Sequence, residues 1–351
     1  MIGFLIDMTE LGFVPHPLVR LGIRRLCGQR LTALAESVGK EPQFIERYVD
    51  SLRHSPVAVA TDVANQQHYE VPAAFFARCL GKQRKYSCAF FPENVHSLDE
   101  AETLALNLTM ERADIHDGMR ILELGCGWGS LTLAMAARFP GARITAISNS
   151  SSQREFIENE LRARGLTNTT VLTRDMASFD AADVEPGGFD RVVSVEMFEH
   201  LRNYEEVLAR IKTWLVPGGK LFVHIFTHRN FPYLFEADGD HNWMGKYFFT
   251  GGQMPSHNLL KCFQKDLQLE SEWAWDGTHY QKTAEAWLRN LEANKQEILR
   301  LFTGVYGSAE AVRWLNRWRI FFLSVSELFG FRSGSEWGVS HYLFTKQKEG
   351  Q

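Results

Sequence analysis

The sequence lacks the long apolar runs that membrane-spanning and secreted proteins require. Its most apolar late stretch, residues 320–331, is too short to cross a bilayer and contains Glu327. The apolar start, residues 1–11, carries Asp7 and Glu10, whereas a secretory signal needs a basic start and an uninterrupted apolar core. We therefore expect no stable membrane insertion, although the protein could still act on a lipid.

Cysteine is sparse and the net charge is small. The five cysteines are scattered, without the paired spacing of metal ligands: Cys27, Cys79, Cys88, Cys126 and Cys262. An odd, scattered set is typical of reduced thiols, so we expect no metal site and a cytoplasmic location. The net charge of -4 gives no electrostatic reason to expect a nucleic-acid partner.

The first 75 residues carry apolar side chains at helical spacing and form the first of two expected units. We interpret this N-terminal helical segment as a structural cap or as the contact of a homodimer. Direct contact with a substrate is the alternative. Residues 76–351 form the second unit.

From about Gly118 onward, short apolar runs alternate with helical segments. The expected strands are Arg120–Leu124, Arg143–Ser148, Val171–Thr173, Phe189–Val195 and Lys220–Ile225. This alternation predicts an α/β fold, in which a parallel sheet has helices on both faces. Ligands of such a sheet bind beyond the carboxyl ends of its strands.

After the fifth strand the pattern changes. Residues 226–335 are rich in aromatic residues, glycine and histidine and then become helical again. We interpret them as a lid over the ligand edge of the sheet. A closing strand is expected at His341–Thr345.

The most specific motif is the glycine-rich run at residues 123–129, which follows a strand and opens a helix. Gly125 and Gly127 let the backbone approach a ligand closely, and the helix start supplies free N–H groups. The spacing G-x-G-x-G differs from that of a dinucleotide loop, and Glu123 would repel a phosphate but suit an ammonium group. The methionine half of S-adenosylmethionine carries an ammonium and a sulfonium, so the run predicts a site for this compound.

Polar residues follow the next two strands at the same edge. The second strand lacks the acid that usually holds a ribose, so Asn149 and Gln153 are the candidates to bond the ribose hydroxyls. Helix capping is the alternative for both. After the third strand, Asp175 can accept from an adenine amino group while Met176 packs on the ring. A simple turn role is the alternative for Asp175.

Glu196, Glu199 and His200 follow the fourth strand, where two carboxylates and an imidazole are costly to bury without partners. An amine that accepts a methyl group must lose a proton, which a nearby His or Glu can take. The carboxylates can also attract a cationic amine. The alternative is that Glu196 caps backbone amides and that His200 is a structural histidine.

Four segments of the sequence resemble the cyclopropane-fatty-acid synthase and mycolic-acid methyltransferase superfamily: Tyr86–Phe91, Leu122–Gly129, Asn149–Gln153 and Glu196–His200. Further segments strengthen the resemblance to its plant coclaurine and pavine N-methyltransferase branch: Phe222–His228, Tyr247–Gly252, His279–Thr283, Glu327–Gly330 and Glu336–Trp337. The resemblance begins near residue 65 and continues to the end of the chain. It implies a Rossmann-like class I methyltransferase fold and N-methylation of a small amine.

The resemblance also implies roles for individual residues. The expected donor contacts are Tyr86, Ser87, Gly125, Gly127, Asn149, Gln153 and Asp175. In the coclaurine-type enzymes, the positions that match Glu199 and His200 are the proposed acid–base pair, with Glu196 nearby. Trp337 lies in a stretch that resembles the wall of the acceptor pocket.

An alternative chemistry comes from the same resemblance. In the cyclopropane synthases, the positions that match Cys88, Glu199, His224 and Tyr280 hold a bicarbonate ion. This ion takes a proton after an alkene in an acyl chain is methylated. All four residues are present here, so methylation of an unsaturated lipid with bicarbonate as the base remains the second hypothesis.

Overall fold

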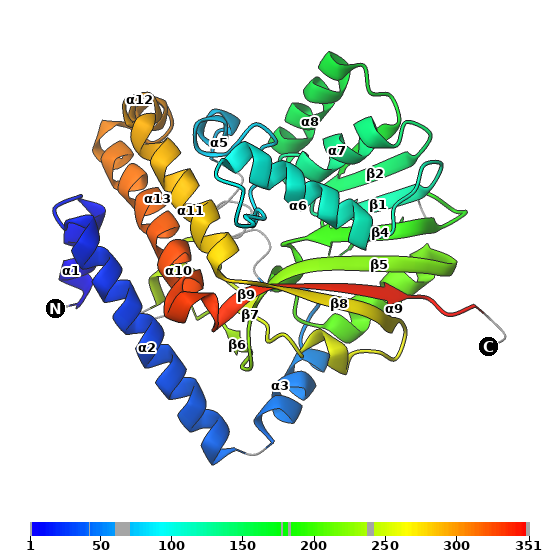
Figure 1. Ribbon diagram of the computed structural model, residues 1–351, viewed down its shortest axis with the longest axis horizontal. Coiled ribbons are helices and arrows are strands. Elements are labelled where there is room, and N and C mark those ends of the chain that lie inside the picture. Colours follow the sequence, from blue (N-terminus) through cyan, green and yellow to red (C-terminus); the bar gives the residue numbers. More distant parts are fainter. Residues whose placement is uncertain are drawn as a thin grey trace.

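The protein is described by a computed structural model that covers residues 2–41, 43–59, 71–176, 178–181, 184–236 and 242–348. A twisted sheet lies beside a layer of long helices, and the chain begins in a helical arm at the edge of the molecule (Figure 1). Of the expected N-terminal helical segment, residues 60–70 lie outside the described part of the chain.

In the described residues, seven strands form one sheet in the order β3-β2-β1-β4-β5-β9-β8. Their bounds are β1 Arg120–Leu124, β2 Arg143–Ser148, β3 Thr169–Thr173, β4 Phe189–Val195, β5 Leu215–His228, β8 Gln268–Asp276 and β9 Trp337–Thr345. The strands β1 to β5 run parallel, and β9 and β8 add two antiparallel strands at one edge. The expected bounds of β1, β2 and β4 are confirmed, and the sheet as a whole is mixed rather than parallel.

Helices cover both faces of this sheet, as the α/β pattern predicts. Successive side chains of β1 belong to the hydrophobic clusters on opposite faces of the sheet. Ile121 lies in the cluster with α6, α7 and α8, whereas Leu122 lies in the cluster with α3 and α9. The bounds of these helices are α3 Phe44–Arg53, α6 Leu98–Arg112, α7 Ser130–Arg138, α8 Ser151–Arg164 and α9 Tyr204–Trp214. The carboxyl edge of the parallel strands is left for the loops.

The expected lid at residues 226–335 has two parts. Residues 268–276 form β8, which pairs with β9 and so extends the main sheet instead of belonging to a lid. This pairing satisfies backbone N–H and C=O groups that would otherwise lack partners. The remainder supplies a strand pair, one short helix and three long helices: β6 Tyr233–Leu234, β7 Gln253–Met254, α10 Trp243–Tyr247, α11 Thr278–Ala293, α12 Lys295–Tyr306 and α13 Ser308–Phe329. With α5, Ala73–Cys79, these helices bury the largest aromatic cluster.

The N-terminal arm consists of α1, Ile2–Glu10, and α2, His16–Lys40, followed by α3. The helix α2 lies along α13 (Figure 1), and Arg20 donates to Glu285 at 2.6 Å and to Glu327 at 2.7 Å. Beyond α3 the chain returns to the sheet, where Ala58 forms a β-bridge with Leu201. None of the described helices is long and apolar enough to cross a membrane.

Candidate active site

The glycine-rich loop after β1 opens a pocket at the carboxyl edge of the sheet. The N–H groups of Gly125 and Cys126 both donate to the carbonyl of Ile147 at the end of β2, which fixes the loop between the two strands. Gly127 has a φ of +52°, and a Cβ built there would meet nothing within 4 Å. Its missing side chain therefore faces open space, as close approach of a ligand to the backbone requires.

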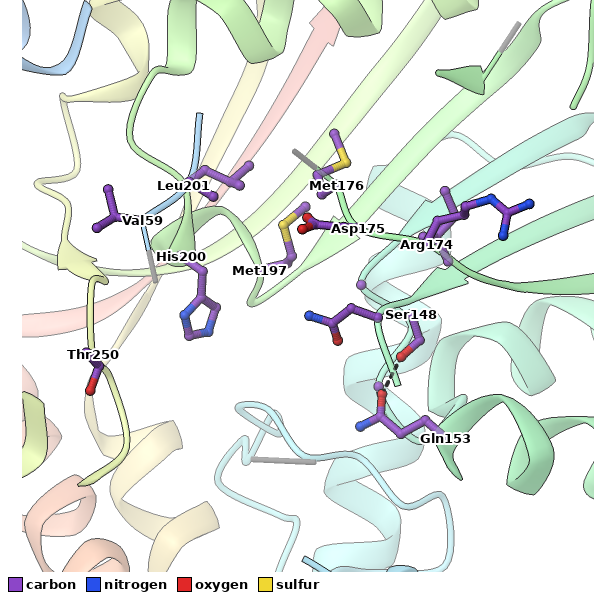
Figure 2. A pocket seen from close by; sticks show the side chains of 15 residues that line it. Val59, Ser148, Gln153, Arg174, Asp175, Met176, Met197, His200, Leu201 and Thr250 are labelled. Atoms are coloured by element: carbon purple, nitrogen blue, oxygen red, sulfur yellow. Dashed lines mark hydrogen bonds between the residues drawn. The ribbon is translucent and has the colours of Figure 1, made fainter. Parts of the chain in front are cut away.

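Four of the predicted donor contacts line this pocket beside the glycines: Asn149, Gln153, Asp175 and Met176. Figure 2 shows Ser148 and Gln153 on one side of the pocket and His200 and Thr250 on the other. The amide oxygen of Gln153 accepts from the hydroxyl of Ser148 at 2.7 Å, so part of its hydrogen-bonding capacity is used inside the protein. The remaining polar groups are of the kinds that bond a ribose and an adenine.

A second pocket adjoins the first, and the two share Gly125, Gly127, Gln153, Met197 and His200. It contains all three predicted acceptor residues and has an aromatic wall: Glu196, Glu199 and His200 face Trp128, Phe226, Phe249, Tyr280, Trp287 and Phe321. Two ligands held in these adjoining spaces would touch one another, as a transfer between them requires.

Tyr86 and Ser87, predicted as donor contacts, line the second pocket. They are followed by Cys88, which is buried behind the wall. Ser87 accepts from the fully buried ammonium of Lys85 at 2.5 Å, and Lys85 also donates to the carbonyl of Cys88 at 2.7 Å. The burial of Lys85 close enough to interact with Glu196 and Glu102 was not predicted, because nothing in the sequence distinguishes this residue from a surface lysine.

Glu196 is the centre of the hydrogen-bond network of the second pocket. Its carboxylate accepts from the N–H of Cys88 at 2.9 Å and from the hydroxyl of Tyr280 at 2.6 Å, and it lies 3.2 Å from Nε2 of His224. Its backbone adopts a φ of +48°, which is uncommon for a residue with a side chain and is typical of functional sites. Burial raises the pKa of Glu196, and the nearby Lys85 cation opposes that rise.

Glu199 differs from Glu196 in having one oxygen without a partner. Its Oε2 is buried and has no hydrogen bond among the described residues. Burial, and next the charge of Glu196, raise the pKa of Glu199 well above its usual range. A buried acid that lacks a donor is costly, so the pocket favours a ligand that brings one.

His200 ends the short 3-10 turn Phe198–His200 and borders both pockets, with its ring stacked on Phe249 at 6.1 Å. It is the histidine best placed to meet both ligands. His224, by contrast, is fully buried and reaches the pocket only through Glu196.

Trp337 does not line either pocket, which corrects its prediction as an acceptor wall. It is buried at the start of β9, where Nε1 donates to the hydroxyl of Tyr233 at 3.1 Å and the ring meets His228 edge-on. The wall consists instead of Trp128, Tyr280 and Trp287 together with phenylalanines of β5, of α13 and of the loop after α10. Aromatic residues are so frequent in this half of the chain that the sequence does not show which of them line the pocket.

The N-terminal segment also reaches the site. Ala58 and Val59 line the first pocket, held there by the Ala58 bridge to Leu201 and by the bond from the N–H of Arg202 to the carbonyl of Val57. The end of the N-terminal segment therefore contributes to the wall of the first pocket.

The model of the mycolic acid cyclopropane synthetase family matches residues 59–330. The chain belongs to this family. The (S)-coclaurine N-methyltransferase of Thalictrum flavum subsp. glaucum is 39% identical over 348 residues, which are 98% of this chain and 95% of the relative. The resemblance to the coclaurine-type branch is therefore confirmed.

Solved structures agree with this membership. A crystal structure of coclaurine N-methyltransferase bound to N-methylheliamine and S-adenosylhomocysteine is 37% identical, with a TM-score of 0.90 and 98% of both chains covered. A cyclopropane synthase of Mycobacterium tuberculosis is 21% identical with a TM-score of 0.67, covers 83% of this chain and all of its own, and shows the fold alone. The protein is an S-adenosylmethionine-dependent methyltransferase, and S-adenosylmethionine is its methyl donor.

We expect Gly127→Val to abolish binding of the donor while the protein still folds. The new side chain would project into open space that the ligand needs, and it meets no protein atom within 4 Å at Cβ. The measurement is the rise in melting temperature on addition of S-adenosylhomocysteine, which any ligand selective for the folded state must cause.

Gly118→Val is the matched control. Gly118 has a φ of +82° and equally open surroundings. It lies before β1, whereas Gly127 lies after β1 at the ligand edge of the sheet. This variant carries similar backbone strain and should keep the full thermal shift. A normal shift in Gly127→Val would place the donor elsewhere.

Proposed function

We propose that this methyltransferase transfers the methyl group to the nitrogen of a small amine that carries an aromatic ring. The observation that carries the proposal is the buried Oε2 of Glu199, which has no donor among the described residues and lies in a pocket with aromatic walls. An amine or ammonium N–H supplies the missing donor. An unsaturated acyl chain has no donor to supply.

The aromatic wall supports the same kind of acceptor. Phe226, Phe249 and Phe321 contribute ring surfaces from three separate elements. Rings of this kind pack well on a flat apolar acceptor and attract a cation over their faces, which contributes roughly 0.5 to 2 kcal/mol. The similarity to an enzyme solved with N-methylheliamine adds independent support for an amine acceptor.

Glu199 and His200 are the residues that would handle the proton. Bound S-adenosylmethionine supplies an electrophilic methyl group on its sulfonium, and the acceptor nitrogen needs a free lone pair to attack it. Because the pKa of Glu199 is raised, this carboxyl binds a proton far more readily than an ordinary glutamate. His200, at the junction of the pockets, is the second acceptor for the proton and orients the nitrogen.

The alternative that uses bicarbonate is not supported by the arrangement of its residues. The N–H of Cys88, the hydroxyl of Tyr280 and the ring of His224 converge on the carboxylate of Glu196. A protein carboxylate thus takes the donors that an anion would need, and its charge would repel bicarbonate. The residues present do not fit this ion.

We expect His200→Ala to lower kcat by roughly two to four orders of magnitude, the usual scale for a positioned base, with little change in affinity for S-adenosylhomocysteine. The measurement is turnover with a panel of small aromatic amines and labelled donor. His96→Ala, which removes an exposed histidine, should behave like the unaltered enzyme. A near-normal kcat in His200→Ala would leave proximity of the substrates as the main source of catalysis.

The raised pKa of Glu199 predicts the direction of the pH dependence. Below that pKa the carboxyl is protonated and cannot act as a base, so kcat/KM should rise as pH increases through it. Glu199→Gln should remove this limb. The profile is measured with two amine acceptors of different pKa. A limb that is due to Glu199 stays at the same pH with both acceptors, whereas a limb that is due to the amine shifts with the pKa of the amine. A profile that follows only the acceptor would contradict the role of Glu199.

Removing bicarbonate from the assay should leave amine methylation unchanged, because Glu196 already occupies its donors. The measurement compares carbon-dioxide-free buffer with the same buffer after bicarbonate is restored. In parallel, vesicles of unsaturated phospholipid are offered as acceptor. A phospholipid product that gains one methylene in a bicarbonate-dependent reaction would overturn the proposal.

A further inference from the structure

A row of hydrogen bonds leads from Glu196 away from the pocket to the end of α6. Nε2 of His224 lies 3.2 Å from Oε1 of Glu196, and Nε2 of His341 lies 2.9 Å from Nδ1 of His224. Nη1 of Arg112 lies 2.5 Å from Nδ1 of His341. Four side chains, from the turn after β4 and from β5, β9 and α6, therefore form one connected series.

The two imidazoles sit inside the protein. His224 and His341 are cross-strand partners in the antiparallel pair β5–β9, and both are fully buried. Burial lowers the pKa of each ring well below its usual range, and the next causes are Lys85 and Arg112 for His224 and the His224 ring, followed by these two cations, for His341, so both rings are neutral at physiological pH. A neutral imidazole has one donor and one acceptor nitrogen, so each ring can occupy either of two tautomers.

Arg112 determines which tautomers fit. A guanidinium only donates, so Nδ1 of His341 must accept and its proton must lie on Nε2. That N–H donates to Nδ1 of His224, which places the remaining proton of His224 on Nε2, directed at Glu196. Glu196 therefore faces a third fixed donor, beside the N–H of Cys88 and the hydroxyl of Tyr280.

We propose that Arg112 is a positioning residue that fixes the tautomers of His341 and His224 and thereby holds Glu196 as an ionised carboxylate. Without the Arg112 donor, both imidazoles can change to the tautomer that is protonated on Nδ1. Nε2 of His224 then becomes an acceptor, and Glu196 can hold a proton between them. The guanidinium itself is held over the rings of Trp273 and Trp275, at 5.1 Å and 5.6 Å, outside the reach of the acceptor.

The consequence for catalysis rests on the proposed function. The charged and titratable groups of the described residues beside Glu196 are Lys85, Cys88, Glu199, His200, His224 and Tyr280, and the negative charge of Glu196 is one cause of the raised pKa of Glu199. When Glu196 takes up a proton, this cause disappears and Glu199 becomes a weaker base. Arg112 thus acts on the base through three intervening side chains.

The first test reads the tautomers directly and needs no activity. The nitrogen NMR spectrum of the ¹⁵N-histidine-labelled protein is assigned with His224→Asn and His341→Asn, in the absence of substrates. Both rings should be neutral and protonated on Nε2 in the unaltered protein. Protonation of His341 on Nδ1 would overturn the proposal even if amine methylation is confirmed.

The second test compares Arg112→Met with Arg112→Lys. The methionine removes the donor, whereas lysine is also a cation that only donates and should preserve the tautomers. Arg112→Met should lower kcat by on the order of tenfold or more. This is the scale seen in metalloenzymes when the hydrogen-bond partner that orients a metal-binding histidine is removed. Its acidic limb of kcat/KM should move to lower pH, and Arg112→Lys should restore both.

Arg138→Met is the control, because it removes an exposed arginine at the end of α7 that donates to Asn107 at 3.0 Å. Its profile should match that of the unaltered enzyme. A purely structural role of Arg112 would lower the melting temperature and leave the acidic limb in place, and that result would overturn the proposal. If Arg112→Met does not fold, the NMR measurement of the tautomers in the unaltered protein still tests the proposal.

Discussion

A single buried carboxylate constrains the architecture of this site. Glu196 has only 7% of its side chain exposed and sits on a strained backbone at the end of β4. Such a group is tolerated only when donors surround it, and here they come from the loop before α6, from β5 and from α11. The hydrogen bond from Tyr280 ties α11 to the sheet at the catalytic edge. Three hydrogen bonds thus offset the cost of burying the carboxylate, and they hold the three elements in a fixed arrangement around it.

The parallel sheet and the glycine-rich loop bring the two substrates to this point. Loops after β1, β2 and β3 line one pocket, the turn after β4 lies between the pockets, and the aromatic wall closes the second. Met197 links the halves, because a Cβ on Gly125 would stand 2.8 Å from its side chain. The loop that faces the donor and the turn that carries the acids are therefore packed as one unit, and neither can shift without the other.

Sequence patterns predicted the features that depend on neighbouring residues. Strand periodicity gave the bounds of β1, β2 and β4, and glycine spacing gave the loop. The role of Glu196 as the centre of a network could not be predicted, because its partners lie about 28 to 110 residues away and its backbone conformation depends on them. The same applies to Arg112 and His341, and to β8, whose pairing depends on a strand some sixty residues later. Trp337 shows the converse: a residue type suited to the task was present but packed elsewhere.

The composition of the acceptor wall has a consequence for substrate breadth. Phe226, Phe249 and Phe321 form a part of the wall without polar groups that a wrong substituent could leave unpaired, whereas Trp128 and Trp287 on the same wall each carry an indole N–H. An apolar surface like that of the phenylalanines rejects an added methylene or hydroxyl by only about 1 to 3 kcal/mol, whereas a surface that hydrogen-bonds a substrate rejects its analogues far more strongly. Under the proposed function, selectivity on this side of the pocket depends on where the acceptor nitrogen lies relative to Glu196 and Glu199. If the acceptor is the aromatic amine proposed above, substituents on a ring that packs against the phenylalanines are free to vary, and one such catalyst can serve a family of related amines.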